Sequence, residues 1–350
     1  MISKEPKVEC LVVCFGRRGG SIQLTEAILG ELLQAQIPIR LALSKEREGK
    51  QDFGVNADFE GRFSFSYLIR TLGIGATIEI FRFCNFVLKS NPKNVLWIMP
   101  HPLDLIPRMI TKSFGIYNVS IIHEIRPHAG SKWPPSWYTK IIIRLSKSVI
   151  FLSEYEASKI SLANRNTKKF VIRHPILHLS KVASTTVNIN HGNYILFIGR
   201  IQSYKGLAIL ADAWRNVFQE TDLFLVIAGE GALPNAAKQL PNTQYLNRWL
   251  SDGEMRFIIE GATALVFPYL EASQSGLLAT DLIVGKRKIL TNVPGLLEYA
   301  TGNTIFVESN NVSALESGIR SLFKSDYLNS QPNNSHQIGT DWIQIFRDKL

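Results

Sequence analysis

The chain has 350 residues, a length that favours two domains over one. Hydrophobic residues make up 45% and charged residues 19%, which is typical of a globular protein and excludes a disordered or low-complexity chain. The apolar run near the amino terminus covers only 8–15, shorter than a secretory signal or a membrane span, so we expect a cytoplasmic protein.

Short apolar runs alternate with segments of helical periodicity, a pattern typical of parallel sheets covered by helices. The predicted strands of the first half are 8–15, 37–42, 95–99, 119–123, 149–152 and 170–173. Those of the second half are 194–198, 223–228, 244–246, 264–267 and 288–290. We therefore expect an α/β protein with two doubly wound domains, 1–181 and 192–350, joined by a polar linker over 182–191.

Smaller signals refine this picture. Ser153 with Glu156 and Ser251 with Glu254 predict capping boxes at two helix starts.

The three cysteines, Cys10, Cys14 and Cys84, do not have the spacing of a metal site. We expect them to be buried, reduced thiols.

Basic residues are concentrated in the first half of the chain. Residues 1–181 hold 26 of the 39 Lys and Arg and 14 of the 29 Asp and Glu, a net charge of +12, whereas the other residues have a net charge of −2. Such asymmetry indicates an acidic partner, nucleic acid or an anionic membrane surface, although a solvated basic face has the same composition.

Two strand-to-helix turns are candidate phosphate sites. The first predicted strand leads into GRRGG, where Gly19 and Gly20 would let the backbone approach an anion at a helix start, unless the segment is only a tight turn. In the second half, YILFIGR ends in Arg200, and Lys205 follows just before a predicted helix. A guanidinium and an ammonium at one turn suit the two phosphates of a diphosphate, although each could instead pair with a surface carboxylate.

These residues lie in longer motifs that resemble a known family. ILFIGRIQSYKGLAIL, VIAGEG (226–231) and FPYLEASQSGLLATDLIVGKRKILTNVPGLLE (267–298) resemble the donor domain of GT-B glycosyltransferases, family 4. GRRGG, SIIHEIRPH (120–128) and VIFLSEYEA (149–157) resemble its acceptor domain less specifically. The resemblance implies a GT-B fold, in which two Rossmann-like domains face a cleft, and retaining transfer from a nucleotide sugar.

The resemblance also implies roles for single residues. The diphosphate would be held by Arg200 and Lys205, and the donor would be lined by Ser275, Gly276 and Leu277. His123 would face the sugar, with a purely structural histidine as the alternative. His128 would lie on the acceptor side, and Arg126, Gly19 and Gly20 would add positive potential and backbone amides on the same rim.

One departure affects the ribose site. Members of the family carry two glutamates eight residues apart, and this sequence has Ala272 and Thr280 at those positions. Glu271 and Asp281 each lie one residue away, so Glu271, Thr280 or Asp281 must replace a ribose-binding glutamate.

The implied reaction needs no pair of catalytic carboxylates, because the donor phosphate itself helps to deprotonate the acceptor. No D-x-D motif occurs, so we expect no metal and no cofactor, the nucleotide sugar being a co-substrate. The expected activity is a metal-independent hexosyltransferase acting on a glycan or lipid-linked acceptor in surface polysaccharide synthesis.

The segment 132–147 bears on location. Trp137, Ile141 and Leu145 share one predicted helical face, and Lys140, Arg144 and Lys147 share another. This is the composition of an interfacial helix, although a core-facing helix with a basic solvated side is the alternative. With the +12 half, it predicts peripheral attachment at the inner face of the plasma membrane.

Two other functions compete with this prediction. Tyr155 and Lys159 form the Y-x-x-x-K pair of short-chain dehydrogenases, but the amino-terminal glycine fingerprint of that class is absent. A nucleic-acid-binding protein would rest on charge alone, without a recognition motif, so we expect no nucleic-acid partner.

Overall fold

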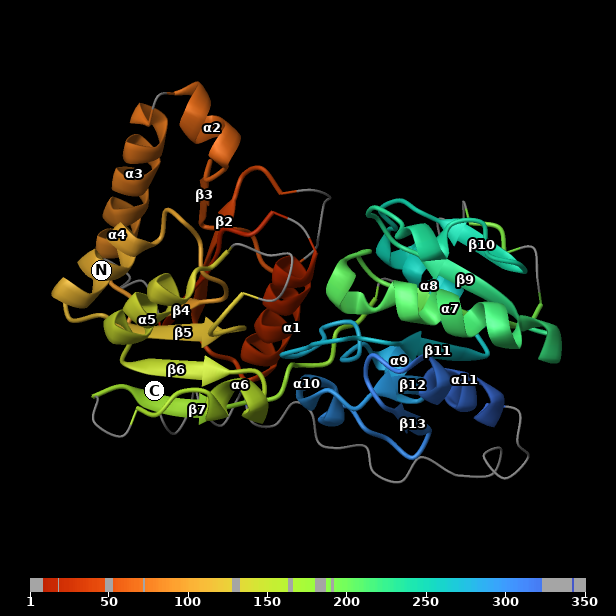
Figure 1. Ribbon diagram of the computed structural model, residues 1–350. Helices are drawn as coiled ribbons and strands as arrows, with labels where there is room; N and C mark the ends of the chain where they lie inside the picture. Colours follow the sequence, from red (N-terminus) through yellow and green to blue (C-terminus); the bar gives the residue numbers. More distant parts are fainter. Residues whose placement is uncertain are drawn as a thin grey trace. The chain divides into compact units, whose positions relative to one another are not determined.

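The computed structural model describes residues 9–17, 19–47, 53–71, 73–127, 133–162, 166–179, 187–189, 192–322 and 342 (Figure 1). They form two compact units. Unit 1 contains the described residues up to Pro175 together with Trp342, and unit 2 contains those from Ile176 to Leu322. Each unit has a parallel sheet with helices, which confirms the predicted α/β class and the two doubly wound sheets.

Unit 1 holds a seven-stranded sheet in the order β3-β2-β1-β4-β5-β6-β7. Its strands are β1 Cys10–Cys14, β2 Ile39–Ser44, β3 Phe59–Gly61, β4 Asn94–Trp97, β5 Tyr117–Ile122, β6 Ser148–Phe151 and β7 Lys168–Val171. Its helices are α1 Gly20–Gln34, α2 Phe65–Arg70, α3 Ile74–Ser90, α4 Leu105–Ser113, α5 Ser136–Leu145 and α6 Glu154–Ser158.

The alternation of side chains along β1 divides the core of unit 1 between the two faces of its sheet. Cys10 and Val12 pack in the same cluster as residues of α1, whereas Leu11 and Val13 pack with residues of α3. Successive strand residues point to opposite faces, so an unbroken apolar run marks a strand buried on both sides. Cys10, Cys14 and Cys84 are buried free thiols, as predicted.

Unit 2 holds a six-stranded sheet in the order β10-β9-β8-β11-β12-β13. Its strands are β8 Tyr194–Ile198, β9 Phe224–Ala228, β10 Thr243–Leu246, β11 Ala264–Phe267, β12 Lys288–Thr291 and β13 Thr304–Val307. Its α-helices are α7 Leu207–Val217, α8 Asp252–Gly261, α9 Asp281–Val284, α10 Pro294–Leu297 and α11 Val312–Ser321, and its short 3₁₀ turns are η1 Ser203–Lys205, η2 Phe218–Glu220 and η3 Asn235–Ala237.

The predicted division between the domains needs two corrections. Trp342, expected in the second domain, is 1% exposed and belongs to the core of unit 1, where its indole nitrogen donates to the Arg173 carbonyl oxygen at 3.3 Å. Leu179, just before the predicted linker, and Val187, within it, are buried in the core of unit 2. The chain thus enters unit 2 earlier than its polar composition indicated, because isolated apolar residues anchor a mostly polar stretch.

Of the two predicted capping boxes, one is complete. Ser251 and Glu254 satisfy each other's backbone amides at the start of α8. At α6, the Ser153 hydroxyl accepts from the Glu156 amide, but the Glu156 carboxylate accepts from the amide of Ile125 at 2.8 Å. The second half of that box is therefore absent, since a tertiary partner has taken the carboxylate. No helix in the described part of the chain is long and apolar enough to span a bilayer.

Candidate functional site

The predicted donor residues of unit 2 lie in the loops that follow β8 and β11. These strands are neighbours at the centre of the sheet, where the strand order reverses. In doubly wound sheets the two loops at such a point leave on opposite sides and form a crevice that binds ligands. Arg200 and Lys205 come from the first loop and Ser275 from the second, so the fold brings these two groups of predicted residues to one edge of the sheet.

Glycines allow the loops of this edge to touch. Gly206, with φ +69°, precedes α7, and a Cβ there would lie 1.8 Å from the Pro268 carbonyl oxygen. Gly229, with φ +139°, follows β9, and a Cβ there would lie 2.1 Å from the Gly199 carbonyl oxygen. Any larger residue at either position would push the loops apart, and with them the Arg200 and Lys205 loop.

Tyr269, in the loop after β11, contacts residues of the loop after β8. It was not identified as a site residue from the sequence. The Lys205 ammonium nitrogen lies 3.7 Å from the centre of the Tyr269 ring and 5.2 Å from that of Tyr204. The Tyr269 carbonyl oxygen accepts from the Thr291 hydroxyl at 2.6 Å and from that of Ser309 at 3.0 Å. The signal was available in the sequence, because Tyr269 follows a predicted strand inside the FPYLE motif.

Tyr269 also contributes a buried phenol hydroxyl to this edge. Burial, followed by the proximity of Tyr204, raises the pKa of the Tyr269 phenol, against the lowering influence of Ser275 and Arg200. The phenol therefore stays neutral and can donate. The buried side-chain oxygen of Gln202 has no hydrogen-bond partner among the described residues, whereas the Ser275 side chain lies beside the Tyr269 phenol. Buried polar atoms usually have partners, so the Gln202 oxygen is suited to a polar ligand.

Hydrogen bonds within unit 2 hold the segment 270–280, which follows Tyr269 and leads to α9. Ser275 is buried, and its amide donates to the Tyr299 hydroxyl at 3.2 Å, while its hydroxyl accepts from the Leu278 amide at 3.4 Å. Gly276 and Leu277 are only half-buried in the turn that follows. These hydrogen bonds fix the backbone of Ser275 and Gly276, and the Ser275 side chain lies beside the Tyr269 phenol.

The three candidates for the ribose site differ in their surroundings. Thr280 is buried, and its hydroxyl donates to the Leu277 carbonyl oxygen at 2.8 Å. The Asp281 carboxylate lies 3.0 Å from the Nδ1 atom of His178. Glu271 is exposed and lies two residues after Tyr269. Of the three, Thr280 has its hydroxyl committed within the fold.

Unit 1 has the corresponding edge where β1 and β4 are neighbours. Gly19 precedes α1 with φ +67°, and no side chain caps this helix. Gly20 opens the helix and is exposed. The loop after β4 contributes His101, which sequence reasoning missed. Its ring packs edge-on against Phe15 at 5.7 Å between centroids, and its Nδ1 atom accepts from the Leu103 amide at 3.2 Å.

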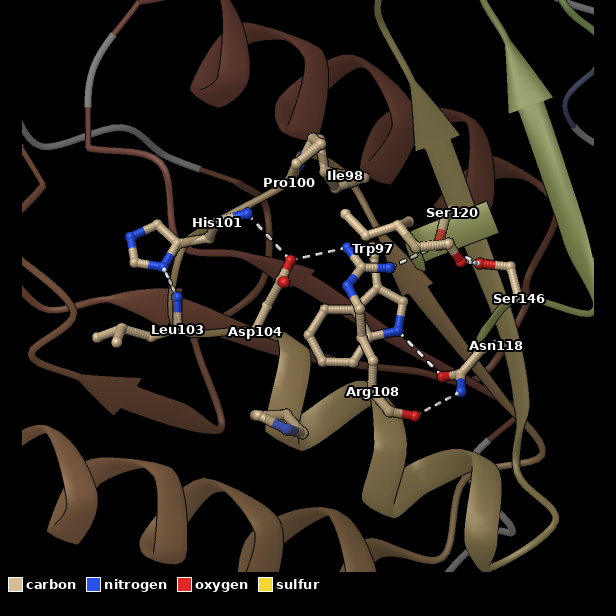
Figure 2. Close-up of polar contacts among 12 residues, drawn as sticks. Trp97, Ile98, Pro100, His101, Leu103, Asp104, Arg108, Asn118, Ser120 and Ser146 are labelled. Atoms are coloured by element: carbon tan, nitrogen blue, oxygen red, sulfur yellow. Dashed lines mark hydrogen bonds and ion pairs between the residues drawn. The ribbon is translucent and has the colours of Figure 1, made fainter. Parts of the chain in front are cut away.

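A buried ion pair holds the loop after β4 in place (Figure 2). Asp104 and Arg108 are almost fully buried and 2.8 Å apart, and the Asp104 carboxylate also accepts from the His101 amide at 3.0 Å. The Tyr138 hydroxyl donates to Asp104, and Arg108 donates to the Ser120 hydroxyl at 2.6 Å. A buried pair with this many additional partners fixes the geometry of α4 and of the His101 loop.

The predicted acceptor-side residues follow β5. His123 is partly buried, and its Nε2 atom lies 3.1 Å from the Ile98 carbonyl oxygen. Burial lowers the pKa of His123 to about 4, despite the bond to Ile98, so its imidazole is neutral at pH 7. Arg126 is exposed three residues later. His128 lies outside the described residues.

A sequence-family match was found for unit 2 but not for unit 1. Residues 192–325 match the family described as glycosyl transferases group 1, a match confined to unit 2 and the segment that follows it. No curated protein matches the chain in sequence.

Solved structures match the chain over nearly its whole length. HepE from Anabaena in complex with UDP is 12% identical, with a TM-score of 0.62 and coverage of 89% of each chain. Sucrose-phosphate synthase from Thermosynechococcus elongatus is 12% identical, with a TM-score of 0.63, over 96% of this chain and 93% of that one. UDP-GlcNAc 2-epimerase from Neisseria meningitidis bound to UDP-GlcNAc is 15% identical, with a TM-score of 0.60, over 96% and 98%. The chain therefore has the GT-B fold of two Rossmann-like domains, and residues 192–325 of its second unit are similar to the group 1 glycosyl transferases.

Proposed function

We propose that the protein transfers a hexosyl group from a nucleotide-diphosphate sugar to a glycan or lipid-linked acceptor, with retention of configuration. The observation that carries this proposal is the convergence of Arg200, Lys205 and Tyr269 at the switch point of the group 1 domain. The Anabaena HepE structures in complex with UDP, and with UDP and glucose, support a donor of this class in the same fold.

In the proposed mechanism the two cations act on the leaving group. Arg200 is exposed and makes no ion pair within the described residues, so its guanidinium is available to a diphosphate. Lys205 approaches from the face of the Tyr269 ring. Fixed cations that meet the charge developing on the diphosphate lower the barrier without a metal ion or a cofactor. A donor phosphate oxygen then takes the acceptor proton, and the Tyr269 phenol supplies a hydrogen-bond donor.

The ribose is assigned to Glu271 in this proposal. Glu271 is exposed in the segment after β11 that also carries Tyr269 and Ser275. A carboxylate can accept from both ribose hydroxyls at once. Ser275, Gly276 and Leu277 would line the remainder of the donor.

The acceptor is assigned to unit 1. The candidates there are the exposed amino end of α1 at Gly20, the neutral imidazole of His123, and Arg126, with His128 beyond the described residues. The basic composition of this half suits an acidic, lipid-linked acceptor at the inner face of the plasma membrane. Assembly of a surface polysaccharide is the process that we propose for such a reaction.

Three alternatives rest on other observations. The fold alone does not separate transferases from epimerases, because UDP-GlcNAc 2-epimerases match it equally well. The short-chain dehydrogenase pair finds less support, since the Lys159 nitrogen lies 4.0 Å over the centre of the Tyr155 ring and is paired with Glu156. A nucleic-acid-binding function rests on charge alone.

The test is a screen of nucleotide sugars with and without a lipid-linked acceptor, read out by release of the nucleoside diphosphate and by the configuration of the product. The proposal expects diphosphate release that is stimulated by acceptor, and a product with the donor's anomeric configuration. An epimerised nucleotide sugar without transfer would assign the chain to the epimerases instead. Inverted product would overturn the retaining mechanism.

A further inference from the structure

The outer face of α3 exposes large apolar side chains. Ile74, Ile78, Phe81 and Leu88 lie one or two turns apart along one stripe, and Phe81 is 73% exposed. The opposite side of the same helix packs Phe83 and Val87 into the sheet. The helix is therefore apolar on two faces, of which the sheet covers only one.

The neighbouring helices extend this stripe. α3 packs beside both α2 and α4 (Figure 1). α4 exposes Ile106 and Met109, and Phe114, directly after it, is 64% exposed. Together with Ile69 at the end of α2, these residues form what we call the α2–α4 surface: Ile69, Ile74, Ile78, Phe81, Leu88, Ile106, Met109 and Phe114. Single exposed apolar residues are ordinary, but eight on or directly after three adjoining helices mark an interaction surface.

The exposed charges on these helices and on the neighbouring α5 all have one sign. Arg70, Lys89 and Lys112 are exposed on α2, α3 and α4, and Lys140 and Arg144 are exposed on α5, which packs beside α4. Glu79 is the one acidic residue within these four helices; it is buried and paired with Arg82 at 2.9 Å. The helices therefore present cations and no exposed carboxylate.

A basic hollow lies at the ends of α4 and α5. Lys112, Arg144 and Lys147 line a surface hollow of about 450 Å³ together with Ser146 and Thr167. The Lys112 ammonium donates to the Arg144 carbonyl oxygen at 2.7 Å, which holds the end of α4 against that of α5. Three cations are thus gathered at the end of α4, the helix that Phe114 directly follows.

We propose that the α2–α4 surface lies on an anionic lipid bilayer, with its apolar side chains between the headgroups and the surrounding cations against lipid phosphates. A bilayer supplies both an apolar layer and negative charge, which is the combination that this surface complements. A second copy of the chain would instead oppose cations to cations.

This inference moves the membrane contact away from the position that the sequence indicated. Trp137 is exposed on α5, but Ile141 and Leu145 are half-buried, so α5 contributes one aromatic ring and its cations. Lys147 lies after the end of that helix. The inference rests on the proposed function in one respect, the identity of the membrane. The vesicle-binding test uses neither donor nor acceptor.

The experiment is co-sedimentation of the full chain with vesicles of phosphatidylcholine alone and of equal phosphatidylcholine and phosphatidylglycerol. The double variant Ile78→Ser, Phe81→Ser should bind anionic vesicles about tenfold more weakly than wild type. Lys112→Gln should cost about fivefold, and more in low salt than in high salt. The control, Phe257→Ser, removes an exposed ring of unit 2 and should bind as wild type does. Wild-type binding by the double variant, or equal binding of wild type to both vesicles, would overturn the proposal.

Two further measurements keep the outcomes separate. Unchanged melting temperatures would show that the double variant is folded, as expected for substitutions at exposed positions. Light scattering without lipid should find the same mass for wild type and variant, whereas a wild-type dimer that the variant loses would assign the surface to self-association. Donor hydrolysis by the double variant should equal that of wild type. If no nucleotide sugar is turned over but anionic vesicles bind through this surface, only the proposed reaction fails.

Discussion

The ammonium nitrogen of Lys205 lies 3.7 Å from the centre of the Tyr269 ring, although 64 positions separate the two residues. The contact joins the loops after β8 and β11, which leave opposite sides of the switch point. A cation held over an aromatic face keeps its charge and loses much of its freedom to rotate. Tyr269 thereby holds Lys205 at the edge of the sheet where we propose that the diphosphate binds.

Replacing the ring should weaken the reaction through Lys205. Tyr269→Leu is expected to lower kcat/KM for the donor about thirtyfold, since a cation–π contact at a desolvated site contributes about 2 kcal/mol. Tyr269→Phe keeps the ring and should retain more activity than Tyr269→Leu. Equal losses in the two variants would mean that the hydroxyl, and not the ring, matters for turnover.

Removing either cation should remove most turnover while the fold is retained. Arg200→Ala and Lys205→Ala each delete a charge from the proposed diphosphate site, and a contact of this kind is worth ~2.7–4 kcal/mol in the transition state. Steady-state rates with a saturating donor measure the effect. Lys238→Ala, which removes an exposed cation of unit 2 that is bonded to Asn235, is the matched control. A rate near that of wild type for Arg200→Ala would disprove its role.

Chelation should leave activity unchanged. The sequence contains no D-x-D pair, and Arg200 and Lys205 supply the positive charge that a divalent ion would otherwise bring. Initial rates before and after dialysis against EDTA test this expectation. Loss of activity that is restored by magnesium or manganese would be incompatible with the metal-independent mechanism.

Breaking the buried ion pair of unit 1 should destabilise the protein. Arg108→Met leaves the Asp104 carboxylate buried without its cation, which is expected to cost ~3–5 kcal/mol of unfolding free energy. Denaturant titration measures the loss. The double variant Asp104→Leu, Arg108→Met removes both charges and should recover part of the stability; a double variant less stable than the single one would contradict this account.

Acid should destabilise unit 1 through its buried histidines. Burial lowers the pKa of His174 to about 4, so between pH 6.5 and 4 the unfolded chain binds more protons than the folded one. Stability should therefore fall as the pH is lowered through this window, with His174 contributing roughly 3 kcal/mol. Urea unfolding at several pH values should show a shallower slope for His174→Gln. The exposed His178, replaced by glutamine, serves as the control, and an unaltered slope in His174→Gln would exclude this histidine as the cause.

How far the sequence predicted the fold depends on the length of each local pattern. β8 and β11 are found at their predicted bounds, because a strand buried on both faces is an unbroken apolar run. β3 and β13 were not predicted: β3 (FEG) has no apolar run, and the run in β13, in which Phe306 is exposed, covers only 305–307. The local order of residues was also sufficient to place Arg200 and Lys205 at a strand-to-helix turn.

What the sequence alone determined about this protein is therefore local: the strands, their order, and which residues follow them. Only the tertiary structure decided which distant groups meet, as with Tyr269 beneath Lys205 and Trp342 in the core of unit 1. It also decided which side of α3 remains uncovered, because a helix that is apolar on two faces does not indicate which one the sheet will take. The physical reason is that burial depends on the partner that a side chain finds across the fold, and periodicity along the chain does not specify that partner.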